Sequence, residues 1–219
     1  MPTSRPKRSY HHGDLRRALV DAAWQLVRDG GLQALSLREV ARVVGVSHAA
    51  PYHHFPTRGA LLDALAEQAF TGLEHAQRVA LGDLTDGPQM LYAIGRAYID
   101  FAREHPEQVL VMFRARAEDE GASPASLIEI GERAFAQLFD VVSTCQQQGA
   151  APQGDTHELA LAQWSLVHGF AKLWVEGPLT VMPSYANSFE RLRDALLHGV
   201  REGWSAQARQ TGAGVRSEN

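Results

Sequence analysis

The segment 47–55 carries side chains whose types and order suit contact with the bases of a DNA duplex. His48 and His53 can donate hydrogen bonds to base edges in the major groove. Ala49 and Ala50 are small enough for close approach to the bases and can contact a thymine methyl group. The chemistry expected of this segment is recognition of a nucleic acid.

A helix that enters a DNA groove also needs anchors on the phosphate backbone. Tyr52 can hydrogen-bond a phosphate, and Arg38, near the start of the preceding helix, could reach a phosphate or a guanine. A helical hairpin whose polar face is merely solvated would show a similar pattern. Of these two interpretations, the residue types favour the DNA-binding surface.

Local signals predict the helices that would position these side chains. Ser36 and Glu39 form a capping-box pattern, in which the Ser36 hydroxyl accepts from the Glu39 amide and the Glu39 side chain reaches back to the Ser36 amide. Gly45 is suited to end that helix. A second short helix is expected over 48–54, before Pro56. Two short helices separated by three residues have the spacing of a helix-turn-helix.

Longer helices are expected elsewhere, because apolar residues recur at helical spacing and strand-like alternation is scarce. Before the helix-turn-helix one helix is expected over 14–28, and after it another is capped by Thr57 and runs to about residue 80. Further helices are predicted over 88–104, 106–114, 124–148, 156–176 and 188–208. The expected fold class is all-α, with an N-terminal three-helix DNA-binding domain and a larger C-terminal helical domain.

The charge of the chain is distributed unevenly. Residues 1–60 hold nine Lys and Arg but only four Asp and Glu, whereas the whole chain has a formal net charge of −4. Three of these cations, Arg5, Lys7 and Arg8, form an N-terminal arm that could lie along phosphates or enter the minor groove. The arm could equally be a solubilising tail, and the clustering could be chance. If the arm binds DNA, the basic end of the chain is a local surface for a polyanion.

The expected helix over 156–176 is apolar on two faces. Leu159, Leu166 and Phe170 belong to one stripe, while Val167 and Trp174 belong to the other. A chain of this size can cover one face, and a second copy could cover the other. We therefore expect a homodimer formed by this helix and the one over 188–208. The alternative is a central helix enclosed by its own chain.

Aromatic and apolar side chains also gather over 93–116. Tyr98, Phe101, Met112 and Phe113 could line an apolar pocket, with the tyrosine as a polar handle. They could equally be ordinary core residues.

The run 14–70 resembles the N-terminal DNA-binding domain of TetR-family transcriptional regulators. The matching motifs are Leu37-Arg38-Glu39-Val40-Ala41, Gly45-Val46-Ser47, Tyr52-His53-His54-Phe55-Pro56 and Leu61-Leu62. The resemblance implies DNA contact for Arg38, Ser47, His48, Ala49, Ala50, Tyr52, His53 and Arg58.

Two positions depart from the family pattern. Pro51 stands where the family often has Leu, and a proline there removes an amide donor, so the recognition helix should start late or be kinked. Gly59 stands where the family often has an acidic residue, which weakens the start of the following helix.

The run from Trp164 to Gly169 is similar to the Trp-His-Gly signature of one C-terminal ligand-binding subgroup of these regulators. This resemblance implies ligand contacts for Trp164 and His168. A structural histidine that is satisfied inside the domain is the competing interpretation of His168.

Other classes of function lack support in the sequence. The single cysteine, Cys145, excludes an internal disulfide framework and zinc sites that need several thiolates. The adjacent pairs His11-His12 and His53-His54 have poor chelating geometry, so no metal is expected. No nucleophile elbow, paired-carboxylate motif or phosphate-binding glycine loop is present, so we expect neither an enzyme nor a cofactor. Without a membrane-spanning run or a signal sequence, a cytoplasmic protein is expected.

These features, with the resemblance, predict a sequence-specific transcriptional regulator: a repressor released from a palindromic operator by a small apolar effector. Its expected partners are double-stranded operator DNA, a second copy and the effector, with no membrane. An activator of the same fold, or a helical small-molecule binder with a vestigial helix-turn-helix, are the alternatives. The expected parts are a basic arm over 1–13, the DNA-binding domain over 14–60, the linking helix to about 80, the effector and dimerisation domain over 81–208, and a flexible tail over 209–219.

Overall fold

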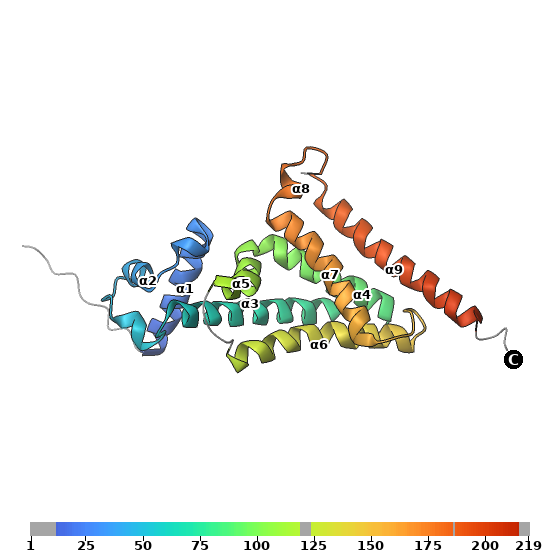
Figure 1. Cartoon of the computed structure of the whole chain (residues 1–219), viewed down its shortest axis with the longest axis horizontal. Helices are drawn as coiled ribbons and strands as arrows, with labels where there is room; N and C mark the ends of the chain where they lie inside the picture. Colours follow the sequence, from blue (N-terminus) through green and yellow to red (C-terminus); the bar gives the residue numbers. More distant parts are fainter. Residues whose placement is uncertain (1–11, 119–123, 186, 215–219) are drawn as a thin grey trace, which may run out of the picture. The chain divides into compact units, whose positions relative to one another are not determined.

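The computed structural model describes residues 12–118, 124–185 and 187–214, and all regular structure in those residues is helical (Figure 1). In chain order the helices are α1 (His12–Gly30), the 3-10 helix η1 (Leu32–Ala34), α2 (Leu37–Val44), the 3-10 helix η2 (Ala50–His53), α3 (Arg58–Leu81), α4 (Gly87–Glu104), α5 (Pro106–Glu118), α6 (Ala125–Gln147), α7 (Thr156–Val175), α8 (Pro178–Val181) and α9 (Phe189–Gly214). This architecture confirms the all-α fold class expected from the sequence.

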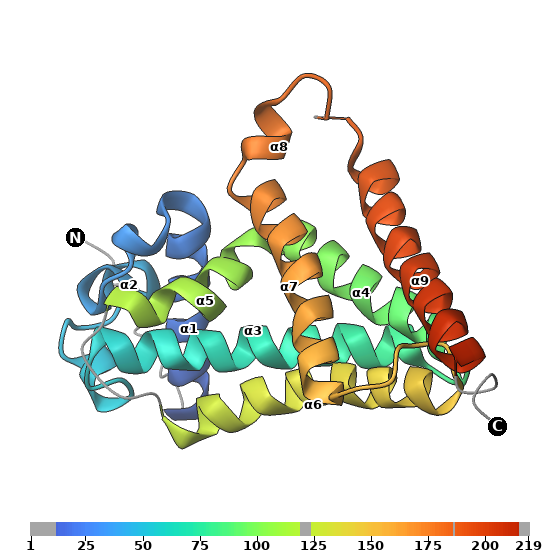
Figure 2. The same cartoon turned by 45° about the vertical axis from the view of Figure 1, so that its right-hand side comes forward.

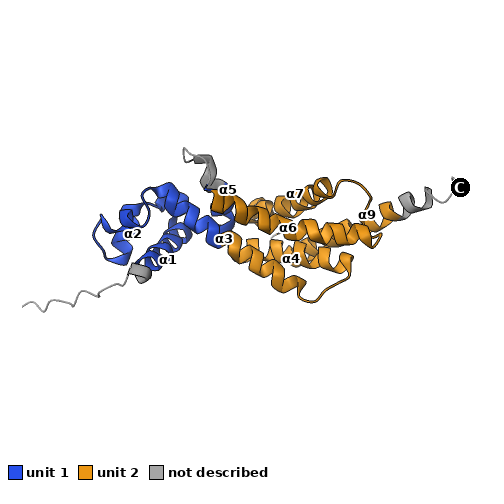
Figure 3. Cartoon of the chain, turned by 90° about the horizontal axis from the view of Figure 1, so that it is seen from below, with its two compact units in different colours: residues 1–68, 107–124 blue, residues 69–106, 125–219 orange. Residues whose placement is uncertain are grey.

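The chain divides into two compact units, which Figure 3 colours separately. Unit 1 contains Met1–Gln68 and Glu107–Pro124, and unit 2 contains Ala69–Pro106 and Ala125–Asn219. Helix α3 therefore begins in unit 1 and ends in unit 2. The stretch Glu107–Pro124 belongs to unit 1, although the sequence predicts it within the C-terminal domain over 81–208. That expectation followed position along the chain, whereas the units are defined by packing.

The core of unit 1 is formed where α1 packs against α2 and η1. Leu19, Ala23 and Val27 recur at intervals of four along α1 and are all buried, so they form the apolar face that the sequence pattern indicates. Val40 of α2 and Phe55, which follows η2, are also buried. Burial of these side chains fixes the positions of the helices that carry the candidate DNA contacts.

Helix α2 begins and ends at the predicted residues. The Ser36 hydroxyl accepts a hydrogen bond from the Glu39 amide at 3.1 Å, and Gly45 has a left-handed backbone (φ 77°) from which its amide donates to the Ala41 carbonyl. One half of the predicted capping box is wrong. The Glu39 carboxylate does not reach back to Ser36 but accepts from Arg42 Nε at 2.8 Å, one helical turn further on.

The recognition segment is shorter and tighter than the expected helix over 48–54. Only Ala50–His53 is helical, and it is a 3-10 helix with Pro51 in its first turn. Proline has no amide hydrogen to donate, so an α-helical hydrogen bond cannot form at that position. Instead, the amide of Ala50 donates to the Ser47 carbonyl, and the amides of His54 and Phe55 both donate to the Pro51 carbonyl. The late start expected from Pro51 is therefore present.

Helix α4 is the central helix of unit 2 and packs against α6, α7 and α9 (Figure 2). A Cβ atom added to Gly95 would lie 2.7 Å from Leu197 Cδ2, so the missing side chain lets α4 and α9 approach closely. The buried members of the main apolar cluster in this unit are Leu91, Ile94, Leu138, Val141, Val142, Cys145, Ala151, Ala160 and Trp204.

Side-chain caps define the start of two long helices in unit 2. Asp86 accepts from the Gln89 amide at the start of α4. Asp155 accepts from the amides of His157 and Glu158 at the start of α7. At the other end of the unit, α9 continues to Gly214, six residues into the segment expected to be a flexible tail. The N-terminal arm with Arg5, Lys7 and Arg8 lies outside the described residues.

None of the described helices is long and apolar enough to cross a membrane. Within the same residues, no group of three or more His, Cys, Asp and Glu side chains is placed to hold a metal ion.

Candidate functional site

The turn between α2 and η2 presents most of the candidate DNA contacts to solvent. Tyr52 is half exposed, at 50%. Ala50 and Arg58 are half-buried. The other five candidates are exposed, namely Arg38, Ser47, His48, Ala49 and His53. The structure therefore gathers six exposed candidates on α2 and the short segment that follows it.

Two buried residues hold this exposed segment from behind. Pro51 and Phe55 are buried, so the segment alternates between side chains that face the core of unit 1 and side chains that face solvent. The guanidinium of Arg16 lies 5.1 Å from the centre of the Phe55 ring, within the range of a cation–π contact. The backbone that carries His48, Tyr52 and His53 is thereby anchored on both sides by packing.

Arg58 has a structural task that the sequence did not reveal. Its Nε donates to the Leu35 carbonyl at 3.0 Å and its guanidinium nitrogen donates to the Leu32 carbonyl at 2.8 Å. These carbonyls belong to the turn around η1, so Arg58 ties the start of α3 to that turn. Its contact with DNA, implied by the family resemblance, stays a prediction.

The candidate ligand residues separate between the two units. Met112, which is buried, and Phe113, which is half-buried, lie on α5 within unit 1. The other candidates, Tyr98, Phe101, Trp164 and His168, belong to unit 2. Position along the chain placed Met112 and Phe113 beside Phe101, because the turn at His105 and Pro106 gave no sign of the change of unit.

In unit 2 the structure brings three of these candidates into contact. The Tyr98 hydroxyl lies 2.7 Å from His168 Nδ1, and Tyr98 also hydrogen-bonds Trp164. The rings of Trp164 and His168 are 5.4 Å apart. Phe101 is buried but packs instead on His105, with ring centres 5.0 Å apart. Tyr98 of α4 thus hydrogen-bonds both Trp164 and His168 of α7, and the rings of these two residues contact each other.

Burial controls the protonation of this group. It raises the pKa of the Tyr98 hydroxyl well above its usual value, so the hydroxyl keeps its proton. Burial, followed by the charge of Lys172, lowers the pKa of His168 below its usual value. A neutral imidazole has one nitrogen that accepts and one that donates, so the tautomer of His168 sets which partner donates in its hydrogen bond with the Tyr98 hydroxyl.

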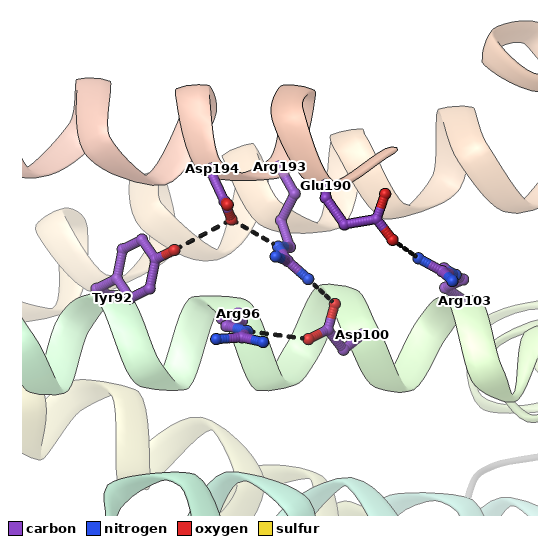
Figure 4. A network of polar contacts seen from close by, with 7 residues as sticks. All are labelled: Tyr92, Arg96, Asp100, Arg103, Glu190, Arg193 and Asp194. Carbon is purple, nitrogen blue, oxygen red and sulfur yellow. Dashed lines mark hydrogen bonds and ion pairs between the residues drawn. The ribbon is translucent and has the colours of Figure 1, made fainter. Parts of the chain in front are cut away.

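A second polar network joins α4 to α9 (Figure 4). The side chain of Arg193 is only 7% exposed, and its guanidinium contacts Asp100 at 2.5 Å and Asp194 at 2.8 Å. Asp194 also accepts from the Tyr92 hydroxyl at 3.0 Å, and Asp100 accepts from Arg96 at 3.2 Å. All five of these side chains are drawn in Figure 4. A buried arginine with two carboxylates fixes the register of one helix on the other.

The charges of this network shift the pKa values of its members. The hydrogen bond from Arg193 lowers the pKa of Asp194 below its usual range. Burial alone would lower the pKa of Arg193. The hydrogen bonds to Asp194 and Asp100 outweigh burial, so the pKa lies above its usual value. The sequence contained one signal of this site, because Arg193 occupies an apolar position of α9, four residues after the buried Phe189 and four before the buried Leu197.

The surface of α7 agrees with the two apolar faces expected from its sequence. Ala160, Val167 and Ala171 are buried within unit 2. On other faces Leu161, Leu166 and Leu173 remain 51%, 45% and 49% exposed. Three large apolar side chains are therefore left on the surface of a single helix.

Comparisons with known proteins match both parts of the chain. The model described as bacterial regulatory proteins of the tetR family matches residues 19–65. The model described as the C-terminal domain of tetracyclin repressor-like proteins matches residues 91–196. A solved structure of a protein with unknown function from a Rhodococcus species is 32% identical, with a TM-score of 0.78, and the match covers 91% of this chain and 100% of that one. The chain belongs to the TetR family.

Two other solved structures of the fold are more distant. The TetR-family transcriptional regulator PfmR from Thermus thermophilus is 22% identical, with a TM-score of 0.63, and the match covers 82% of this chain and 97% of PfmR. AibR, solved with isovaleryl coenzyme A and operator DNA, is 21% identical, with a TM-score of 0.66, over 84% of this chain and 96% of AibR. As a TetR-family protein, the chain is a DNA-binding transcriptional regulator and not an enzyme.

Proposed function

We propose that this TetR-family regulator is a repressor that binds a palindromic operator and is released from it by a small apolar effector. The observation that carries the proposal is the exposed segment 47–53, held by buried Pro51 and Phe55 so that His48, Tyr52 and His53 face solvent. In this proposal residues 14–60 form the DNA-binding domain, and unit 2 binds the effector and a second copy.

The candidate contacts divide into two roles. His48 and His53, with the small Ala49 and Ala50 between them, read base edges, because imidazole nitrogens can donate to or accept from bases. Tyr52, Ser47 and Arg38 bind phosphates and set the position of the segment in the groove. Arg58 acts indirectly, since its bonds to two carbonyls hold the turn that precedes α2.

The regulator acts as a homodimer in this proposal. Two recognition segments about 34 Å apart are needed to read neighbouring major grooves on one side of a duplex. The exposed Leu166 and Leu173 lie seven residues apart on one face of α7 and supply an apolar surface that a second copy would cover. Helix α9 is the second element of the proposed interface.

The effector binds within unit 2 in this proposal. Tyr98, Trp164 and His168 supply ring faces there, and burial keeps the histidine neutral, which suits an apolar ligand. We further propose that the run from Trp164 to Gly169 is a Trp-His-Gly signature. AibR was solved with an acyl coenzyme A and with operator DNA, and this supports the general idea that one chain of this fold binds both a small molecule and DNA.

An activator of the same fold is the alternative, because activators and repressors can share the same DNA contacts. To separate them, the full-length protein is used to select sequences from a random duplex library. The proposal predicts a palindromic consensus, and a reporter promoter that carries it should lose transcription when the protein is present. An increase in transcription would support the activator. A consensus without two-fold symmetry would contradict the dimeric reading of DNA.

A further inference from the structure

Gln77 is a buried polar residue whose oxygen has no partner. Its side chain is 5% exposed, and Oε1 accepts no hydrogen bond from any residue that the structure describes. Nearly all buried polar atoms in folded proteins are hydrogen-bonded, because an unpaired one loses its water without replacement. A buried acceptor of this kind therefore needs a donor from outside the chain.

The surroundings of Gln77 are apolar. Leu73 and Leu81 lie four residues before and after it on α3, so all three share one face of the helix. Leu73 is buried, and Leu81 packs against the main apolar cluster of unit 2, which includes Leu138 of α6 and Ile94 of α4. The Gln77 acceptor thus belongs to the same apolar interior as these residues.

Two other buried polar side chains of this unit have partners. The Tyr98 hydroxyl is hydrogen-bonded to His168, and the buried Arg193 is bonded to Asp100 and Asp194. Packing also closes one side of α4, because Gly95 leaves no space between α4 and Leu197 of α9. Among the side-chain polar atoms that are fully buried in the described residues, the Gln77 oxygen is the one that lacks a hydrogen-bond partner.

We propose that the interior of unit 2 binds a small apolar ligand that carries a hydrogen-bond donor, such as a phenol, an alcohol or an amide N–H, and that Gln77 Oε1 receives that donor. This inference rests on the proposed function and names the chemical class of its effector. In this orientation of the amide a carboxylate or phosphate is disfavoured, because an anionic oxygen beside the Gln77 oxygen would place two acceptors together without a donor. The site also includes α3, the helix that begins in unit 1 at Arg58.

The test compares probes that differ only in the donor. A series of 4-alkylphenols, the matching 4-alkylanisoles and the matching 4-alkylbenzoates is titrated into the full-length protein by calorimetry. Wild type should bind the best phenol about fivefold more tightly than its anisole, the usual effect of one net hydrogen bond, and should bind the benzoate more weakly still. Equal affinity for phenol and anisole, preference for the benzoate, or binding of no phenol would overturn the proposal.

Two variants then locate the effect. In Gln77→Leu the preference for phenol over anisole should disappear, while the thermal midpoint without ligand stays the same or rises because an unpaired oxygen has been removed. The matched control is Gln163→Leu, which replaces another buried glutamine of unit 2 on α7 and should keep the preference. A purely structural Gln77 would instead give a lower midpoint and an unchanged preference. Operator release by an effector without a donor would contradict this inference but leave the proposed function intact.

Discussion

The guanidinium of Arg193 lies 2.5 Å from the carboxylate of Asp100, and this contact joins two helices whose residues are 93 positions apart in the sequence. Arg193 is almost completely buried and also contacts Asp194. Charges taken out of water must be compensated by close partners. The pair therefore holds α9 against α4 in one register.

Replacing Arg193 by Ala should destabilise the protein. The change leaves Asp100 and Asp194 without their shared cation, and because these carboxylates are 28% and 39% exposed, the expected cost is that of a hydrogen bond to a charged group, roughly 1.5–3 kcal/mol. Urea unfolding measures the loss. Lys172→Gln is the control, because Lys172 and Glu176 form an exposed pair, and such pairs contribute about 1 kcal/mol or less. Similar losses in both variants would show that Arg193 is not a buried anchor.

The stability of unit 2 should fall as the solution becomes mildly acidic. Burial lowers the pKa of His168 in the folded protein, so the unfolded chain takes up a proton first, at its ordinary value of about 6.5. The stabilisation is complete above that pH and is lost as the pH falls through the lower folded value. Thermal midpoints of wild type between pH 7.5 and 5 should show this loss.

His168→Asn should remove that part of the pH dependence, because an amide side chain can still hydrogen-bond the Tyr98 hydroxyl as donor or acceptor but does not titrate. His157→Gln, a change at an exposed histidine, should keep the wild-type profile. The assignment is refuted if the Asn variant loses stability over the same pH range as wild type.

Two arginines near the DNA-binding surface should behave in opposite ways. Arg58→Ala removes the donor from two carbonyls of unit 1, so we expect a loss of about 1–3 kcal/mol in the free energy of unfolding. Arg38→Ala changes an exposed side chain, so stability should stay within about 0.5 kcal/mol. The slope of operator affinity against salt should instead fall by about one unit. If Arg58→Ala instead lowered the salt slope and Arg38→Ala instead lowered stability, the structural and DNA-contact roles assigned to the two arginines would be wrong.

The exposed leucines of α7 should control assembly. Leu166→Glu combined with Leu173→Glu places charges on two side chains of one helix face that are already 45% and 49% exposed, so folding of one copy should be little affected. Sedimentation velocity should show a dimer for wild type and a monomer for the double variant. Val79→Glu, at a position 65% exposed on α3, is the control and should leave the dimer intact. A wild-type monomer at micromolar concentration would contradict the proposed dimer.

The sequence predicted features that depend on neighbours in the chain. The Ser36 cap, the Gly45 helix end and the Thr57 cap, whose hydroxyl accepts from the Ala60 amide, involve residues within four positions of each other. The effect of Pro51 on the recognition segment was predictable for the same reason, because a missing amide acts locally.

Features that depend on distant residues could not be predicted. Arg58 bonds carbonyls 23 and 26 positions away, and no sequence pattern distinguishes this role from a phosphate contact. Met112 and Phe113 follow Phe101 closely in the chain but fold into the other compact unit. The unpaired oxygen of Gln77 is visible only once the burial of α3 is known.

Whether the segment 47–53 reads operator bases can be decided by the DNA affinity of His48→Ala. After an operator has been selected, dissociation constants are measured on that operator and on a scrambled duplex. The binding free energy should fall by roughly 1–3 kcal/mol on the operator and by much less on the scrambled duplex, because contacts to base edges distinguish one sequence from another. Tyr52→Phe, which removes a phosphate contact, should lose about 1 kcal/mol on both. Equal losses for His48→Ala on both duplexes would show that His48 contacts the DNA backbone, and would contradict base recognition by the segment 47–53.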